Sequence, residues 1–198
     1  MPAPKKKKQH YVPRFLLKNF STDKRTVRGI VLSSGIVFEE GGIAHQCYED
    51  YFYGKDGDLE NSFAAEEGRI ASLLQDLSQN ALESIPVEDL GSIVFFMHYQ
   101  KYRTFSAAQY VDDLADAHLK AVMKSTLPVT LENGHVMTEE DLDLVRVKTP
   151  MPQIASIYSG AGFTPLLLDL EIKFLLRGDL PGFMISDNPV AFYNQFIE

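Results

Sequence analysis

The sequence lacks several features that mark secreted and membrane proteins. It has a single cysteine, Cys47, which excludes an internal disulfide and is compatible with a reducing cytoplasm. Its longest apolar run, near Ile93–Met97, is far shorter than the roughly 20 residues that a membrane-spanning helix needs. The N-terminus also lacks the apolar segment of a secretory signal. These absences predict a soluble cytoplasmic protein without a membrane partner.

The linear motifs of several large enzyme classes are absent as well. There is no Walker loop, no Rossmann glycine fingerprint, no H-E-x-x-H helix, no paired C-x-x-C and no G-x-S-x-G elbow. His45 and Cys47 are too few to form a zinc site on their own. Any chemistry must therefore come from side chains that the fold brings together.

The sequence does contain enough apolar residues for one core, and its charge is unevenly distributed. Its 198 residues, 45% of them hydrophobic, fit a single domain. The net charge is −8, yet the first 28 positions hold nine of the nineteen Lys and Arg residues. The lysines at the start are either a tail that touches phosphate or a solvated leader. We interpret residues 1–8 as a basic flexible leader and residues 9–198 as one domain.

Apolar spacing predicts a helical centre flanked by β-hairpins. Helices are expected over Asp58–Leu82, Ser84–Phe105, Ser106–Lys124, Thr138–Val147 and Pro152–Ala161. Hairpins are expected over residues 26–38, over residues 128–137, and where the alternating run Leu166–Leu176 is followed by Gly182–Tyr193. The predicted fold class is therefore α+β, with a central helical bundle packed against antiparallel β-hairpins from the N- and C-terminal parts.

One segment near the front combines core-forming and chemically active side chains. It runs from Gln9 to Ser21 and reads QHYVPRFLLKNFS. Its aromatic and aliphatic residues need a buried environment, so the segment is expected to be a fixed part of the fold. Pro13 biases the residue before it towards an extended conformation, and a short helix is expected from about Pro13. His10 then lies just before this helix.

Four polar residues stand near the ends of apolar elements: His10, Glu67, Arg103 and Asp187. Glu67 lies at the edge of an apolar helix stripe, where a carboxylate either meets an arginine or has a functional role. Arg103 ends a buried helix, where it either holds a carboxylate or phosphate or neutralises the terminal carbonyls. Asp187 is either the wall of a site or part of an Asx-turn.

Three groups of motifs, in order along the chain, resemble those of a mostly bacterial family, domain of unknown function 4238. They are QHYVPRFLLKNFS, then Tyr53–Glu60 with Glu67 and Arg103-Thr104, and finally Ile185–Val190. The resemblance brings no established activity. It also implies a C-terminal continuation beyond Ile185–Val190, which this chain, ending at Glu198, lacks.

The first functional hypothesis is a metal-dependent hydrolase of phosphodiesters, such as a nuclease, acting on nucleic acid or nucleotides. His10, Glu67 and Asp187 would be catalytic, and Glu67 and Asp187 would hold Mg²⁺ or Mn²⁺. The substrate would be bound by Arg14, Arg103 and Asn188. A histidine and an acid can also act without a metal, as general base and general acid.

The second hypothesis is a ligand- or partner-binding module without catalysis, in bacterial stress or phage-related biology. Its binding pocket would be aromatic and built from Tyr11, Tyr51, Phe52 and Tyr53. Convergence of His10, Glu67 and Asp187 would favour the metal enzyme, and an apolar pocket with its carboxylates facing solvent would favour the module. A purely structural role is the third reading.

Overall fold

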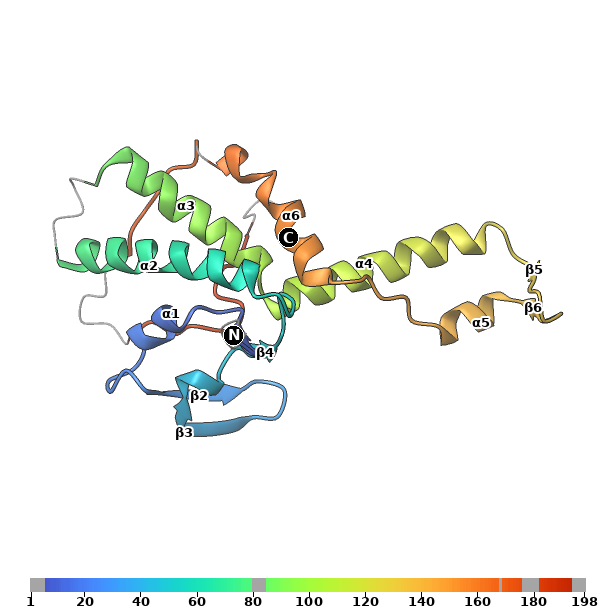
Figure 1. Ribbon diagram of the computed structural model, residues 1–198, viewed down its shortest axis with the longest axis horizontal. Helices are drawn as coiled ribbons and strands as arrows, with labels where there is room; N and C mark the ends of the chain where they lie inside the picture. Colours follow the sequence, from blue (N-terminus) through green and yellow to red (C-terminus); the bar gives the residue numbers. More distant parts are fainter. Residues whose placement is uncertain (1–5, 80–84, 168, 176–181, 194–198) are drawn as a thin grey trace.

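A layer of helices lies over an N-terminal layer of short strands, and a long arm extends to one side (Figure 1). This computed structural model describes residues 6–79, 85–167, 169–175 and 182–193, with no side-chain description for residues 78 and 79. Within these ranges the helices α2 (Asp58–Gln79), α3 (Val87–Tyr102) and α6 (Pro152–Ala161) belong to the body, and α4 (Phe105–Lys124) continues into the arm. The predicted α+β class is confirmed.

The N-terminal layer is made of two small antiparallel sheets. β1 (Lys8–His10) pairs with β4 (Tyr48–Asp50), and β2 (Thr26–Val31) pairs with β3 (Ile36–Gly42). The predicted hairpin over residues 26–38 is thus confirmed, and its turn contains Gly35 at a φ of +70°, which glycine adopts without steric cost. A 3₁₀ turn, η1 (Ile43–His45), leads from β3 towards β4.

The front segment is tied into the body by its backbone and its rings. α1 (Arg14–Asn19) begins after Pro13, as the sequence predicts, and the Phe15 ring lies 5.7 Å from that of Phe96 in α3. Val12 and Leu17 are buried with Ile43 in one core cluster. A second cluster joins Phe52, Tyr53, Phe63 and Ala108, against which Tyr11 packs. The segment therefore connects both clusters.

The main helices begin and end close to their predicted limits because local signals mark their ends. Pro86 is the N-cap of α3, and the Thr104 hydroxyl accepts a hydrogen bond from the Ala107 amide at the start of α4. Thr138 and Asp141 form a capping box at α5 (Glu139–Leu144). Among the described residues, no helix has both the length and the apolar character that a bilayer span requires.

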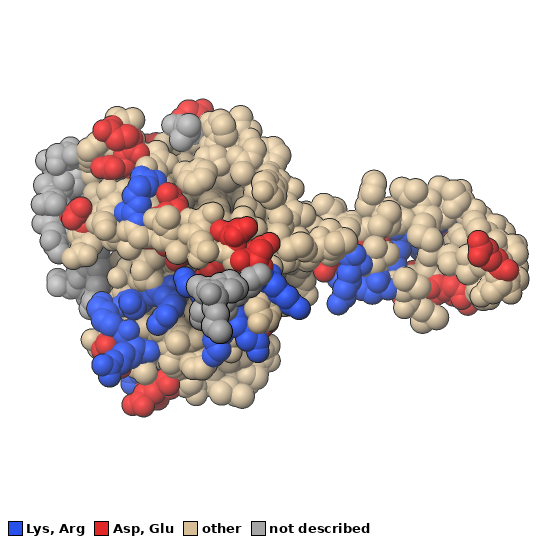
Figure 2. All heavy atoms as spheres, viewed as in Figure 1, with Lys and Arg blue, Asp and Glu red and all other residues tan. Residues whose placement is uncertain are grey.

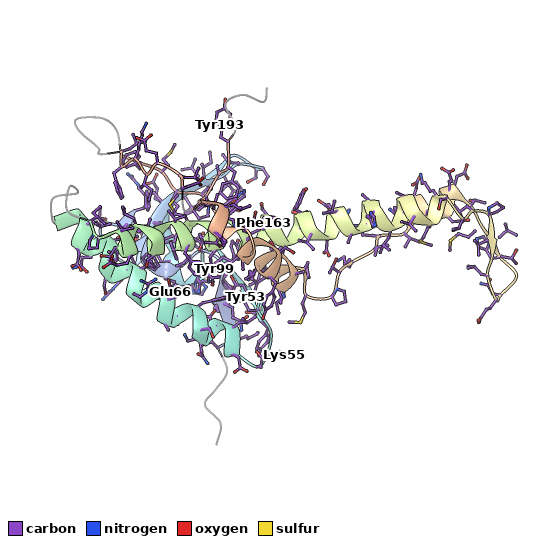
Figure 3. The ribbon with its side chains drawn as sticks, turned by 90° about the horizontal axis from the view of Figure 1, so that it is seen from above. Tyr53, Lys55, Glu66, Tyr99, Phe163 and Tyr193 are labelled. Carbon is purple, nitrogen blue, oxygen red and sulfur yellow. The ribbon has the colours of Figure 1, made fainter. Side chains whose placement is uncertain are left out.

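The arm consists of the far part of α4, the short hairpin of β5 (Val129–Thr130) and β6 (Val136–Met137), and α5. It extends away from the body in both views (Figures 1 and 3). The chain then returns along α4, where the Val147 and Thr149 amides donate hydrogen bonds to Asp116 and Asp112 at 2.7 and 2.8 Å. These carboxylates hold the returning segment to the helix.

The expected C-terminal hairpin is not formed by the described residues. The start of the alternating run is taken up by a 3₁₀ turn, η3 (Thr164–Leu167), and residues 169–175 and 182–193 contain no strand. Leu168 and residues 176–181, which include the expected turn, lie outside the described residues. An alternating pattern gives a strand only where a neighbour pairs its backbone and a core covers its apolar face. Here Leu170 and Leu175 are exposed.

The described part of the basic leader is attached to the fold. Residues 1–5 lie outside the described residues, but Lys8 belongs to β1 and the Lys7 carbonyl accepts a hydrogen bond from the Tyr51 amide at 2.7 Å. The Lys7 ammonium also lies 2.9 Å from the Asp50 carboxylate. Lys7 and Lys8 fall in the stretch that charge alone assigns to a leader. They are nevertheless held in place, because their backbone pairs with the segment that contains β4.

Candidate functional site

A cavity of about 550 Å³ lies between the N-terminal layer and α2. Its charged or titratable lining residues are Lys6, Lys8, His10, Arg14, Glu60 and Glu67, and its uncharged lining residues are Phe15, Ala44, Ala64, Gly68 and Ala71. The small residues of α2 leave the space open, while the segment from Lys6 through strand β1 and the start of helix α1 supply the cations. A cavity of this size is within the range of small-molecule sites.

One side of the cavity carries positive charge. The Lys6 ammonium lies 4.0 Å from the Glu60 carboxylate, and the Lys8 ammonium lies 2.9 Å from Nδ1 of His45. The Arg14 side chain makes no hydrogen bond or ion pair with any other described residue. Its guanidinium is therefore available to an anion, to which it can donate two parallel hydrogen bonds.

His10 ends strand β1 and lies at the edge of the cavity. Burial, and next the guanidinium of Arg14, lowers the pKa of its imidazole to about 4, so the ring is neutral at pH 7. Its Nε2 atom is buried and has no hydrogen-bond partner among the described residues. Buried ring nitrogens usually have a partner, so this atom is a candidate for contact with a ligand.

Glu60 occupies the first turn of α2, on the same side of the cavity as Lys6. Its side chain is 13% exposed, and its Oε2 atom is buried without a partner among the described residues. Burial raises the pKa of this carboxyl, with a smaller opposite effect from Lys6. The cavity therefore brings together a neutral imidazole and a carboxyl group that is biased towards its protonated form.

Arg103 lies beside the cavity in an aromatic cage and is fully buried. Its charge is centred 4.7 Å from the Phe63 ring, 5.1 Å from the Tyr99 ring and 5.5 Å from the Tyr53 ring. Figure 3 labels Tyr53 and Tyr99, which lie near each other in the body. The residue does not line the cavity, so it can act on a ligand only through its neighbours.

Three of those neighbours receive hydrogen bonds from the guanidinium. Nη1 donates to Oε1 of Glu67 at 2.6 Å, Nη2 donates to the His10 carbonyl at 2.7 Å, and Nε donates to the Tyr53 hydroxyl at 3.1 Å. Holding a carboxylate is one of the alternatives that the sequence left open for Arg103, and its contact with Glu67 agrees with that alternative, whereas a role in binding substrate stays a prediction. Because Arg103 also fixes the backbone of His10, it sets the relative position of β1 and α2 at the cavity.

The two residues of the Asp187-Asn188 element lie elsewhere. Asp187 is exposed, and neither it nor Asn188 lines the cavity. The Asn188 amide nitrogen lies 3.5 Å from the hydroxyl of Ser106, and its backbone amide donates to the Ser186 hydroxyl at 3.1 Å. Asp187 and Asn188 therefore form a polar turn near the start of α4 and do not line the cavity, although the charge of Asp187 contributes, after burial, to raising the pKa of Tyr11 and of Cys47.

The expected metal site does not fit the described residues. No three His, Cys, Asp or Glu side chains among them are arranged to hold a metal ion. Glu67 already gives one oxygen to Arg103, and Asp187 lies outside the cavity. The sequence placed Glu67 and Asp187 together on residue type alone, and residue type does not fix their distance.

The rings expected to form a ligand pocket are mostly core residues. Phe52 and Tyr53 are buried with their centroids 4.9 Å apart, and Tyr11 packs against Phe52 at 5.6 Å. Tyr51 has a φ of +57° and lies near the Lys55 ammonium. None of the four lines the cavity. The front motif is thus largely structural, with His10 and Arg14 facing the site.

The model of one protein family matches residues 8–198 of the chain. The chain belongs to the family described as protein of unknown function DUF4238. The family predicted from the sequence motifs is therefore confirmed. No curated protein and no solved structure matches the chain.

Sequence reasoning named His10, Arg14 and Glu67 as site residues, but it did not place Lys6, Lys8 or Glu60 in the same site. The signal for Glu60 was present, since seven residues separate it from Glu67 and two helical turns place both on one face of α2. The lysine run left two alternatives open, contact with phosphate or a solvated leader, because terminal lysine runs are ordinarily solvated and their charge alone does not decide between them.

Proposed function

We propose that the protein hydrolyses phosphodiesters in this cavity, with His10 and Glu60 as the acid–base pair. The observation that carries the proposal is that His10 Nε2 and Glu60 Oε2, both buried and without partners among the described residues, belong to one cavity whose rim is basic. Buried polar atoms usually have a hydrogen-bond partner, and of the unpartnered buried atoms among the described residues these two belong to one cavity.

The basic rim supports binding of a phosphate ester. The cavity is lined by three cations, Lys6, Lys8 and Arg14, which an anion would meet. His10, which is neutral at pH 7, adds no charge to them. Arg14 can bind two phosphate oxygens at once, while the lysines act as point charges. Glu60 opposes an anion less when protonated, and burial favours that form.

The chemistry follows from the protonation states of the two residues. A bound phosphate anion offsets the effect of Arg14 on His10 and raises the basicity of the imidazole. Nε2 of His10 then takes a proton from water as the water oxygen bonds to phosphorus. The Glu60 carboxyl gives its proton to the leaving oxygen as the other P–O bond breaks. The products are a phosphomonoester and an alcohol, and proton exchange with solvent resets both residues.

Arg103 and Glu67 support this site as positioning residues. Arg103 fixes the His10 carbonyl at 2.7 Å and Glu67 at 2.6 Å, so strand β1 and helix α2 keep a constant separation across the cavity. A fixed separation matters because proton transfer requires the two acid–base groups to stay within reach of one substrate. The proposal has no step through Mg²⁺ or Mn²⁺, since the described residues do not provide their ligands.

The test is turnover of bis(4-nitrophenyl) phosphate, followed by release of 4-nitrophenolate, with and without a chelator. Replacing His10→Gln or Glu60→Gln should lower kcat by about 10² to 10⁴. The matched control is Glu66→Gln, since Glu66 is a neighbour on α2 that pairs with Arg69 and lies outside the cavity. Equal activity in all three variants, or no turnover by the unaltered protein, would refute the proposal.

A binding module without catalysis is the second candidate, favoured by the cavity volume of about 550 Å³. Stabilisation by phosphate esters in a thermal-shift assay, lost in Arg14→Gln and without any turnover, would support this reading instead.

A further inference from the structure

The positive charge at the cavity continues along one face of the molecule. The protein carries a net charge of −8, yet its first 28 residues hold nine of its nineteen Lys and Arg residues. Figure 2 shows Lys and Arg side chains gathered over α1 and the loop before β2, on the face that also presents α2. A local cluster of this kind in an acidic protein is a feature of a surface that binds a polyanion.

The order of these residues along the surface follows from the structure. Arg14 lines the cavity, and Lys18 lies one turn further along α1, about 6 Å away along the helix axis. The Lys24 ammonium donates a hydrogen bond to the Lys18 carbonyl at 3.0 Å, which places Lys24 beyond the end of α1. Arg14, Lys18 and Lys24 therefore form a basic track that starts at the cavity.

Two carboxylates near the far end of the track, those of Asp23 and Glu39, are already engaged. Asp23 accepts hydrogen bonds from the amides of Arg25 and Thr26, both at 2.8 Å. Glu39 pairs with Arg28 at 2.5 Å. Neither carboxylate forms an ion pair with Lys18 or Lys24. Among the described residues, the charges of these two lysines are therefore not neutralised by an ion pair.

An exposed aromatic residue follows the helix that carries the track, and it lines a hollow with Asp23, Arg28, Glu39 and Glu40. Phe20 directly follows α1, and 40% of its surface is exposed. Proteins hold single-stranded nucleic acid with cations that follow the phosphates and exposed rings that stack on bases, and the segment from Arg14 to Lys24 carries both kinds of residue. Polyphosphates and acidic peptides have no base to stack there.

We propose that the substrate is a single-stranded nucleic acid, with one phosphodiester in the cavity, its backbone along Arg14, Lys18 and Lys24, and a base on Phe20. This rests on the proposed function in one respect, namely that the cavity takes a phosphodiester. The cavity, of about 550 Å³, has the size of a small-molecule site and admits part of one strand rather than a duplex.

The test measures fluorescence anisotropy of a labelled single-stranded oligonucleotide of about 12 nucleotides at several salt concentrations. The double variant Lys18→Glu/Lys24→Glu should bind at least about tenfold more weakly and show a smaller salt dependence. The control is Lys148→Glu/Lys173→Glu, which makes the same charge change at exposed positions away from the track. Its affinity should fall less than about twofold.

Phe20 separates nucleic acid from other polyanions. Phe20→Leu should weaken oligonucleotide binding several-fold, while Phe20→Tyr, which keeps the ring, should restore it. Circular dichroism of each variant checks that the fold is retained. Two outcomes would overturn the proposal. The first is equal weakening of oligonucleotide binding in the track and control variants. The second is that Phe20→Leu binds the oligonucleotide as tightly as the unaltered protein while inorganic polyphosphate competes fully.

Turnover of bis(4-nitrophenyl) phosphate in the same preparations separates the two proposals. If the protein turns over bis(4-nitrophenyl) phosphate but the Lys18→Glu/Lys24→Glu variant binds the oligonucleotide as tightly as the unaltered protein, the nucleic-acid substrate is overturned. Phosphodiester hydrolysis is then still supported. If oligonucleotide binding depends on the track and on Phe20, but neither bis(4-nitrophenyl) phosphate nor the oligonucleotide is hydrolysed, the nucleic-acid surface is supported and the hydrolase is overturned.

Discussion

Arg103 and His10 are joined by a hydrogen bond of 2.7 Å from the guanidinium to the histidine backbone carbonyl, across 93 positions of sequence. The same guanidinium binds Glu67, so the end of α3 ties the strand that carries His10 to the helix that carries the cavity carboxylates. The site therefore depends on a residue that does not line it.

The first prediction concerns this buried charge. Arg103→Met should lower the free energy of unfolding by about 3 to 5 kcal/mol, because it leaves Glu67 and the His10 carbonyl without their buried partner. Urea denaturation measures the change. The control Arg146→Met removes an exposed pair with Asp113 and should cost much less. An equal loss of unfolding free energy in the two variants would show that the buried Arg103 network stabilises the fold no more than the exposed Arg146 pair does.

Much of the fold could be predicted from the sequence, because helix ends and turns have local chemical causes. Pro86, the Thr138 capping box and Gly35 mark boundaries that the structure confirms. Helical spacing likewise places Glu60 and Glu67 on one face of α2. Local patterns show which face a residue occupies, but they carry no information about the distant partner it meets.

That limit explains the parts that could not be predicted. The cavity needs β1 to lie against α2, and the contact is set by Arg103, whose partners are 36 to 93 positions away. Asp187 and His10 both suit catalysis by residue type, but residue type gives no distance between them. The alternating run from Leu166 predicts a strand, but the pairing of that strand depends on a neighbour that sequence periodicity does not specify.

The second prediction is a pH dependence of stability that originates at His10. Its pKa is lowered from 6.5 to about 4 in the folded protein, so between these values the unfolded chain binds more protons. The contribution is complete above pH 6.5 and is lost as the pH falls towards 4. Because the ring is only half-buried, we expect about 1 to 2 kcal/mol, less than the full linkage value.

Urea unfolding between about pH 7 and about pH 4.5 measures this contribution. The His10→Gln variant should lose less stability over this range than the unaltered protein. His118→Gln, at an exposed position of α4, should behave like the unaltered protein. A pH dependence that is the same in both variants would place the origin elsewhere.

The third prediction uses two glycines close together at the end of α6. A Cβ atom at Gly160 would lie 2.3 Å from the Tyr102 ring, whereas one at Gly162 would meet nothing closer than 4.0 Å. Gly160→Ala should therefore destabilise the protein by about 1 to 3 kcal/mol through overpacking. Gly162→Ala should be neutral or stabilise by about 0.4 to 1 kcal/mol, since its φ of −64° suits alanine.

Melting temperatures of the two glycine variants provide the measurement. A lower melting temperature for Gly160→Ala alone is expected, and a second indicator is available because the Gly160 carbonyl lies 2.7 Å from Nε2 of the buried His98. A shift of Gly160 should alter the NMR signals of that ring. Equal melting temperatures for the two variants would mean that α6 does not pack on Tyr102 as closely as described.

The fourth prediction concerns the arm, where carboxylates of α4 hold the returning chain. Asp116 accepts the Val147 amide at 2.7 Å, while Asp113 pairs with the Arg146 side chain. Asp116→Ala should therefore increase hydrogen exchange at Val147 at least about tenfold, since a charge-assisted backbone hydrogen bond is lost. Asp113→Ala should leave that amide protected, because it removes no backbone acceptor. Hydrogen exchange followed by NMR distinguishes the two, and equal exchange in both variants would mean that contacts other than Asp116 hold the segment to α4.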